Sequence, residues 1–139
     1  MPSKSAKSCS EKKPTHLYEY AVVQFVPDIE RGEFINIGLI MMCKRRKWLR
    51  TSFIVDRERL SAFCRDVNLD VLERQITGFE RVAAGDTREG GPIALLEPHE
   101  RFRWLTAVRS ACLQTSRPHP GRSFDLDQTF ESLFDVLVK

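Results

Sequence analysis

Three acidic side chains in the loop at residues 27–33 are the first candidates for chemistry. Asp28, Glu30 and Glu33 offer the carboxylate oxygens that a hard cation such as Ca²⁺ or Mg²⁺ prefers. Arg31 lies among them, however, and the chain has no second dedicated carboxylate cluster. We therefore expect an ion-paired turn, in which Arg31 neutralises an acid of this loop, and no metal site.

Two further side chains carry groups suited to catalysis. His119 lies between two prolines, close to Ser116 and Arg117, and is the histidine best placed for proton transfer. A surface histidine in a rigid loop is the simpler interpretation. Cys112 lies near Ser110 but has no evident base, and a buried thiol without a base is inert. The chain also lacks a glycine-rich phosphate loop, a G-x-S-x-G elbow, an H-E-x-x-H motif and a dinucleotide fingerprint, so the sequence favours a non-enzymatic protein with no cofactor.

Arginine and aromatic side chains are mixed in the second half of the chain. Guanidinium groups beside aromatic rings suit a carboxylate, a phosphate or a nucleobase. Arg109 and Arg117 would flank the last strand, and a loop carrying Arg31 that faced them would complete a small anion pocket. Internal ion pairs with the acidic residues are the alternative. The candidate ligand-binding residues are Arg31, Glu33, Asn36, Arg101, Arg103, Trp104, Arg109, Gln114, Arg117 and His119.

The charge of the chain is concentrated at its start. The segment before Pro14 has four lysines and one glutamate of the 22 basic and 19 acidic residues, so it accounts for the net charge of +3 and leaves 18 of each sign behind it. We expect residues 1–16 to be a disordered basic tail, either solubilising or an arm for an acidic partner, and residues 17–139 to be a single domain. The neutral domain lacks the overall positive field that drives non-specific binding of nucleic acid, which is therefore not the favoured partner.

Cysteine spacing and hydropathy indicate the compartment in which the protein is expected. The four cysteines share no C-x-x-C spacing, which predicts neither a zinc site nor a disulfide framework. No apolar run reaches the ~18 to 20 residues that cross a bilayer, and the start of the chain does not resemble a signal peptide. We expect a cytoplasmic protein that does not bind membranes.

Apolar patterning predicts a sheet built around one buried strand. The segment Phe34–Cys43 is apolar almost without alternation, which is typical of a central strand covered on both faces. Within it, Asn36 should tether the preceding loop or a neighbouring backbone, and Gly38 should mark a bulge or a close approach of another element. The four predicted strands are Tyr18–Val26, Phe34–Cys43, Trp48–Val55 and Val108–Thr115.

Apolar residues at helical spacing predict the layers on this sheet. Asp56 and Asn68 should cap two helices, the second ending at Gly85 and packing Gly78 on the sheet, and Asp125 should cap a last one. Pro98 opens either a short helix or an edge strand, of which we favour the helix. Residues 116–123 should form a loop. The fold class is α+β, a small antiparallel sheet of about four strands packed by about three helices.

Several short motifs of the chain occur together in a known family. They run from Tyr18 to Val138, and one departure is Val108, where the family pattern often has proline. The motifs are Tyr20-Ala21-Val22, Val26-Pro27-Asp28, Arg31-Gly32-Glu33-Phe34-Ile35-Asn36-Ile37-Gly38, Glu100-Arg101-Phe102-Arg103-Trp104-Leu105, Arg109-Ser110, Gln114-Thr115-Ser116, His119-Pro120-Gly121, Leu133-Phe134 and Leu137-Val138. This pattern resembles the uncharacterised bacterial family called domain of unknown function 3037.

The resemblance and the residues together lead to two hypotheses. The resemblance implies a cytoplasmic bacterial protein without an established activity, and a functional tie to a kinase-like protein of the toxin–antitoxin type. The leading hypothesis is a non-enzymatic protein-interaction module, because no catalytic constellation is present and the segment 101–104 mixes arginine with aromatic side chains. The alternative is a binding or catalytic site for an anion, a nucleotide or a nucleic acid, built from Arg31, Arg109, Arg117 and His119.

Overall fold

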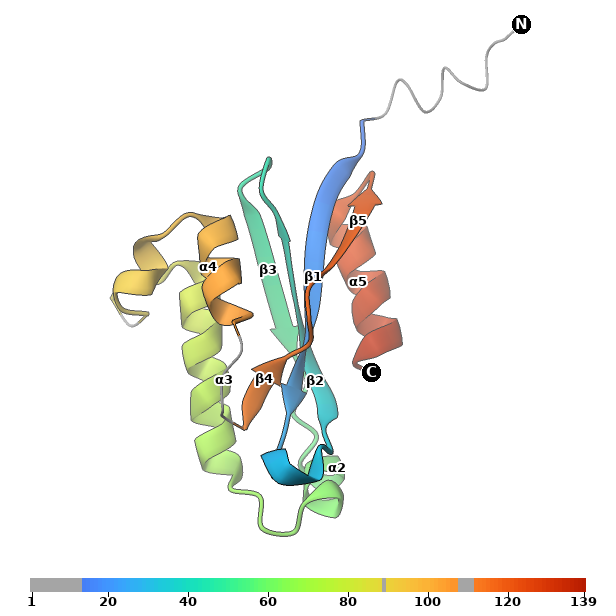
Figure 1. Ribbon diagram of the computed structural model, residues 1–139, viewed down its shortest axis with the longest axis vertical. Coiled ribbons are helices and arrows are strands. Elements are labelled where there is room, and N and C mark those ends of the chain that lie inside the picture. Colours follow the sequence, from blue (N-terminus) through green and yellow to red (C-terminus); the bar gives the residue numbers. More distant parts are fainter. Residues whose placement is uncertain (1–13, 89, 108–111) are drawn as a thin grey trace, which may run out of the picture.

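The chain folds into an antiparallel sheet with helices on both faces (Figure 1). The structure is a computed structural model, which describes residues 14–88, 90–107 and 112–139. Most of the expected tail therefore lies outside the described residues, and His16 already belongs to the first strand. The strands are β1 (His16–Phe25), β2 (Ile35–Cys43), β3 (Trp48–Phe53), β4 (Leu113–Thr115) and β5 (His119–Ser123). The helices are η1 (Ile29–Arg31), α2 (Arg57–Phe63), α3 (Leu69–Ala84), η2 (Pro92–Leu95), α4 (Pro98–Leu105) and α5 (Leu126–Leu137).

The sheet confirms the predicted α+β class and adds one strand. Its order is β3-β2-β1, and both β4 and β5 pair with the other edge of β1. β4 lies against the end of β1, where Phe25 is opposite Leu113, and β5 lies against its start, where Tyr20 is opposite His119. Between the two short strands, the Ser116 amide donates to the Val22 carbonyl and the Val22 amide donates to the Ser116 hydroxyl.

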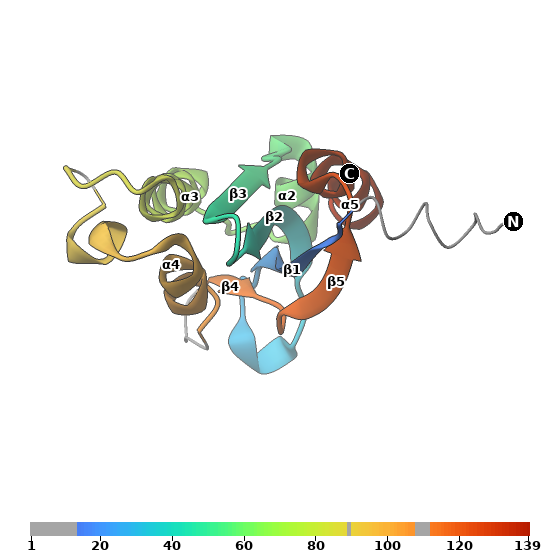
Figure 2. The same cartoon turned by 90° about the horizontal axis from the view of Figure 1, so that it is seen from above.

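Both faces of β2 are covered, as its unbroken apolar sequence predicts. Seen from above, α3 and α4 lie on one side of the sheet and α5 on the other (Figure 2). Ile40 and Met42 of β2 belong to the core beneath α3 and α4, whereas Leu39 and Met41 pack with the core side chains of α5. These four side chains are at most 3% exposed, so β2 forms the centre of the fold.

A β-bulge near the start of β2 confirms both explanations offered for Gly38. Val23 is opposite Gly38 and Gln24 is opposite Asn36, so Ile37 has no partner of its own on β1. A Cβ atom at Gly38 would also lie 2.6 Å from Cδ2 of Phe53. The close approach of the Phe53 ring therefore explains why this position of a buried strand has no side chain.

The predicted helix boundaries are largely confirmed. The side chains of Asp56, Asn68 and Asp125 each accept a hydrogen bond from a backbone amide in the first turn of their helix. α3 ends at Gly85 in the left-handed conformation, with φ of 74°. Pro98 opens a helix, so the helical alternative was the correct one. No helix in the described ranges combines the length and apolar character needed to cross a bilayer.

Two predictions about the fold were wrong. Residues 119–123 form β5 and not a loop, because an edge strand tolerates proline and because Gly121 leaves room for the Tyr18 ring, which a Cβ atom at this position would overlap. Gly78 does not pack on the sheet, since it lies on the exposed side of α3 and a side chain there would point into open space. Of the strand predicted at 108–115, the described part contains β4 (Leu113–Thr115), and residues 108–111 lie outside the described residues.

Candidate functional site

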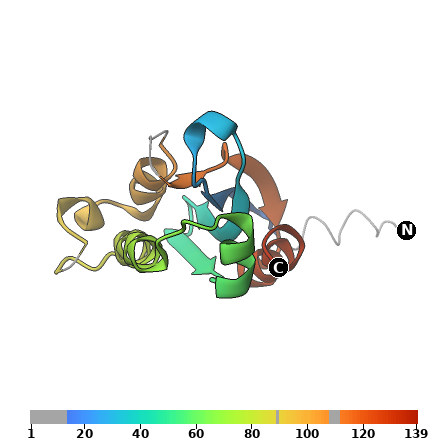
Figure 3. The same cartoon turned by 90° about the horizontal axis from the view of Figure 1, so that it is seen from below.

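A pocket of about 650 Å³ opens at the end of the molecule where β1 stops. Seen from below, the η1 turn lies on one side of the sheet end and α2 on the other (Figure 3). Four separate segments meet here: the loop after β1, the end of α2 with the link to α3, the first turn of α3, and Cys112 before β4. A volume of roughly 300–1,000 Å³ is typical of clefts that hold small ligands.

The floor of the pocket is apolar and anchored in the main core. Phe25 and Leu72 are 3% and 1% exposed, and the ring of Phe63 meets that of Phe25 edge-on at a centroid distance of 6.4 Å. Val67 lies beside them, and Val71, which is 37% exposed, extends the apolar surface outward. Pro27 ends β1 and Asn68 caps α3, so a rigid strand end and a rigid helix start hold the two walls.

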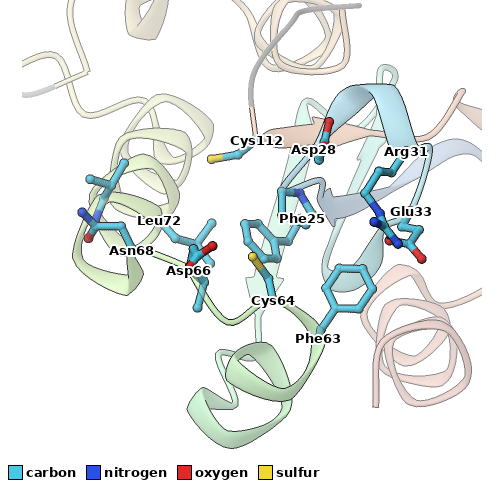
Figure 4. A pocket seen from close by; sticks show the side chains of 13 residues that line it. Phe25, Asp28, Arg31, Glu33, Phe63, Cys64, Asp66, Asn68, Leu72 and Cys112 are labelled. Atoms are coloured by element: carbon cyan, nitrogen blue, oxygen red, sulfur yellow. The ribbon is translucent and has the colours of Figure 1, made fainter.

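The rim of the pocket is charged. Nε of Arg31 donates to Oε1 of Glu33 at 2.8 Å, which confirms the ion-paired turn expected for this loop. This hydrogen bond raises the pKa of Arg31 and lowers the pKa of Glu33, so both groups are charged at neutral pH. Asp28 accepts the backbone amide of Glu30 and so shapes the turn. Figure 4 shows Asp28, Arg31 and Glu33 on one side of the opening, with Asp66 and Asn68 across from them.

Two cysteines line the pocket without a catalytic partner. The Cys112 thiol donates to Oε1 of Gln75 at 2.9 Å, and burial raises its pKa. Less thiolate is therefore present at neutral pH, which is the opposite of an activated nucleophile. Cys64 also lines the pocket, and no histidine does so within the described residues. The same part of the chain holds no cluster of three or more histidine, cysteine, aspartate or glutamate side chains that could bind a metal ion.

Only part of the predicted anion pocket comes together in the described residues. Arg31 and Glu33 line the pocket, but Arg31 is neutralised by Glu33. His119 lies opposite Tyr20 of β1, and the centroids of their rings are 5.3 Å apart. Tyr20 is five residues before Phe25, the residue of β1 that lines the pocket, so His119 is not part of the pocket. Arg117 is exposed on the connection before β5. Arg109 lies outside the described residues, so its place in such a pocket stays a prediction.

The remaining candidates lie elsewhere in the fold. Asn36 donates through Nδ2 to the Leu137 carbonyl at 3.1 Å and so links β2 to α5. This hydrogen bond confirms the expectation that Asn36 tethers a neighbouring backbone. Gln114 lies in β4 opposite Gln24. Nη1 of Arg101 donates to the Leu96 carbonyl at 2.7 Å.

The arginine and aromatic mixture on α4 is only partly exposed. Both terminal nitrogens of Arg103 bind the carboxylate of Glu19 on β1, and Phe102 is fully buried. Trp104 is 43% exposed. Arg103 and Phe102 therefore help to hold α4 on the sheet.

The sequence did not single out half of the pocket. Phe63, Val67 and Leu72 lie on the apolar helical stripes that the sequence predicts to face the sheet, Asn68 was expected only as a helix cap, and no role was expected for Asp66. Their meeting with the loop after β1 depends on how α2 folds back under the sheet, which no local pattern encodes. Val71 is the one available signal, because it is an apolar residue off the buried stripe of α3.

Comparison with known proteins gives one result. The family model described as "Protein of unknown function (DUF3037)" matches residues 20–138. No curated protein and no solved structure matches the chain significantly. The match covers all the segments that form the pocket, and the chain therefore belongs to the DUF3037 family.

Proposed function

We propose that this domain is a non-enzymatic protein-interaction module that receives an apolar side chain of its partner in the pocket at the end of the sheet. The observation that carries this proposal is the pocket itself, which has an apolar floor, a charged rim and, among its described residues, no nucleophile paired with a base. Such a composition suits binding, because an apolar cleft with a few polar groups gives affinity from burial and orientation from its rim.

The energetics of the floor favour an anchor side chain. Full burial of a leucine or phenylalanine contributes roughly 1.5–3 kcal/mol, which is the scale of the anchor residues that dominate protein interfaces. Val71 offers uncovered apolar surface at one wall, and Phe34, which is 52% exposed, follows Glu33 at the other. A partner that covers these side chains gains further apolar burial beyond the pocket.

The partner proposed first is a kinase-like protein of the toxin–antitoxin type, which is the expectation attached to the sequence resemblance. It would meet the module in the bacterial cytoplasm. The alternative function, an anion, nucleotide or nucleic-acid site, has less support because its described members do not converge. Arg31 is bound by Glu33 at the pocket, whereas His119 lies against Tyr20 and Arg117 is exposed on the connection before β5.

A matched pair of substitutions tests the proposed function. Val71→Gln places a polar group at the pocket without changing the charge. Val136→Gln is the control, because it makes the same substitution away from this pocket, on the exposed side of α5, where Val136 is 79% exposed. Both changes replace a β-branched valine with glutamine, which is a better helix former, so neither should disrupt its helix. We expect V71Q to weaken partner binding about fivefold or more, equivalent to about 1 kcal/mol, and V136Q to leave it unchanged.

The measurement has two arms. Isothermal titration calorimetry with the purified kinase-like protein tests the named partner. Quantitative capture from the native host compares the wild type, V71Q and V136Q chains. A protein retained by the wild type and V136Q but lost with V71Q supports the module. Equal retention of every captured protein by all three chains would contradict it.

A further inference from the structure

The charges around the pocket specify what kind of partner segment fits it. Three carboxylates line the opening, those of Asp28, Glu33 and Asp66, against the single guanidinium of Arg31. The described lining therefore carries a net charge of about −2 at neutral pH. The chain after residue 13 is neutral overall, so the rim is a local concentration of negative charge and not a reflection of the whole surface.

The single positive group at the described rim is already neutralised. Arg31 is bound by Glu33 at 2.8 Å, and Asp28 also lies close enough to act on it electrostatically. On the opposite wall, the positive end of the α3 dipole is offset by Asp70 in the first turn of the helix. An incoming anion would therefore find no uncompensated positive group in the described lining, whereas an incoming cation would find Asp66 and Asp28.

The two walls of the pocket place carboxylates on both flanks of the apolar floor. Asp28 comes from the loop after β1 and Asp66 from the link between α2 and α3, with Phe25 between them and Leu72 beside Asp66 (Figure 4). A side chain that enters over the floor thus passes between two carboxylates. Residues before and after it in an extended segment would lie near one wall or the other.

Resting on the function proposed above, we infer that the segment bound here is basic: one aromatic or large aliphatic anchor residue flanked on both sides by lysine or arginine. The anchor fills the apolar floor, and the flanking cations meet Asp28 and Asp66 at the rim. In this arrangement the anchor supplies affinity, because many peptides can bury an apolar side chain. The carboxylates supply selectivity, because they attract basic flanking residues and repel acidic ones.

Three short peptides of matched length test the inference on the full chain. They are acetylated and amidated forms of Lys-Lys-Phe-Lys-Lys, Glu-Glu-Phe-Glu-Glu and Lys-Lys-Gly-Lys-Lys, titrated into isotopically labelled protein at low salt. We expect the first peptide to shift the amide resonances of Phe25 and Val71, and to bind more tightly than either of the others. Loss of the anchor and reversal of the charge should each reduce binding.

Two double variants with the same change in net charge locate the effect. Asp28→Asn with Asp66→Asn removes two of the three rim carboxylates, those proposed to meet the flanking cations, and keeps the oxygen at position 28 that accepts the Glu30 amide. Glu58→Gln with Glu80→Gln removes two exposed carboxylates on α2 and α3 that do not line the pocket. The first pair should weaken binding of Lys-Lys-Phe-Lys-Lys about two- to thirtyfold, and the second should leave it unchanged.

The outcomes separate this inference from the function on which it rests. Any one of four results would overturn the inference of a basic segment. The acidic peptide or the glycine peptide could bind as tightly as Lys-Lys-Phe-Lys-Lys or more tightly. The resonances of Phe25 and Val71 could stay unshifted, or the two double variants could have equal effects. The function would still stand if V71Q lost a partner that V136Q retained. Failure of that capture experiment would overturn the function instead.

Discussion

Two glycines show how differently the same residue type can be used in this fold. Gly38 is required by the Phe53 ring, which in turn packs edge-on against Phe79 of α3 at 5.5 Å. Gly78 has open space around its Cβ position and lies in the middle of a helix, where glycine is entropically unfavourable. The sequence indicates a constraint at both positions, but only the neighbours of each glycine decide whether one exists.

Alanine substitutions at these two glycines should change stability in opposite directions. Gly38→Ala should lower the free energy of unfolding by about 1–3 kcal/mol, because the new methyl group displaces the Phe53 ring. Gly78→Ala should raise it by roughly 0.5–1 kcal/mol. Urea denaturation of both variants measures the two effects. A neutral G38A, or a destabilising G78A, would contradict the packing described for that position.

At the scale of elements, α4 is held to the sheet by an ion pair as well as by its buried side chains. Arg103 of α4 binds Glu19 of β1 through both terminal nitrogens, while Phe102 and Leu105 enter the core. The hydrogen bonds from Arg103 lower the pKa of Glu19. A carboxylate with a lowered pKa stabilises the fold at pH values above its ordinary pKa of 4.5, and this stabilisation is lost as the pH falls through the lowered pKa.

Glu19→Gln should therefore have a pH-dependent effect. At pH 7 we expect a loss of about 0.2–1 kcal/mol, since Arg103 is partly exposed and solvent screens the pair. The difference from the wild type should shrink as pH falls below 4.5, where the wild type is losing the same interaction. Denaturation curves across this range check the prediction, with Glu80→Gln as an exposed control. A constant difference at all pH values would show that charge is not the cause.

Local signals predicted most elements and little of the site. The caps at Asp56, Asn68 and Asp125 and the unbroken apolar run of β2 are properties of neighbouring residues, so the sequence shows them directly. β5 was missed because its prolines indicate a loop unless β1 is known to lie beside it. The pocket depends on the same kind of long-range information, because α2 brings Asp66 and Val67 to the loop after β1.

At the scale of the whole molecule, the pocket lies at the end of the sheet where β1 stops, between the loop that contains η1 and the segment that links α2 to α3. β2 is buried between the helical layers, so the centre of the molecule is rigid and the exposed ends of its elements are where a partner can be recognised. The proposed interaction follows from this architecture, because the cleft at the end of β1 lies over the apolar core and is rimmed by carboxylates.

The most direct test of this account is thiol labelling of the complex with the captured partner. Cys64 and Cys112 line the pocket, whereas Cys43 is 1% exposed in the core and reports on unfolding. Iodoacetamide labelling followed by mass spectrometry gives a rate for each cysteine with and without the partner. We predict that binding slows the labelling of Cys64 and Cys112 while Cys43 stays unlabelled in both states. Unchanged labelling rates at Cys64 and Cys112 in the complex would show that the partner does not occupy the pocket.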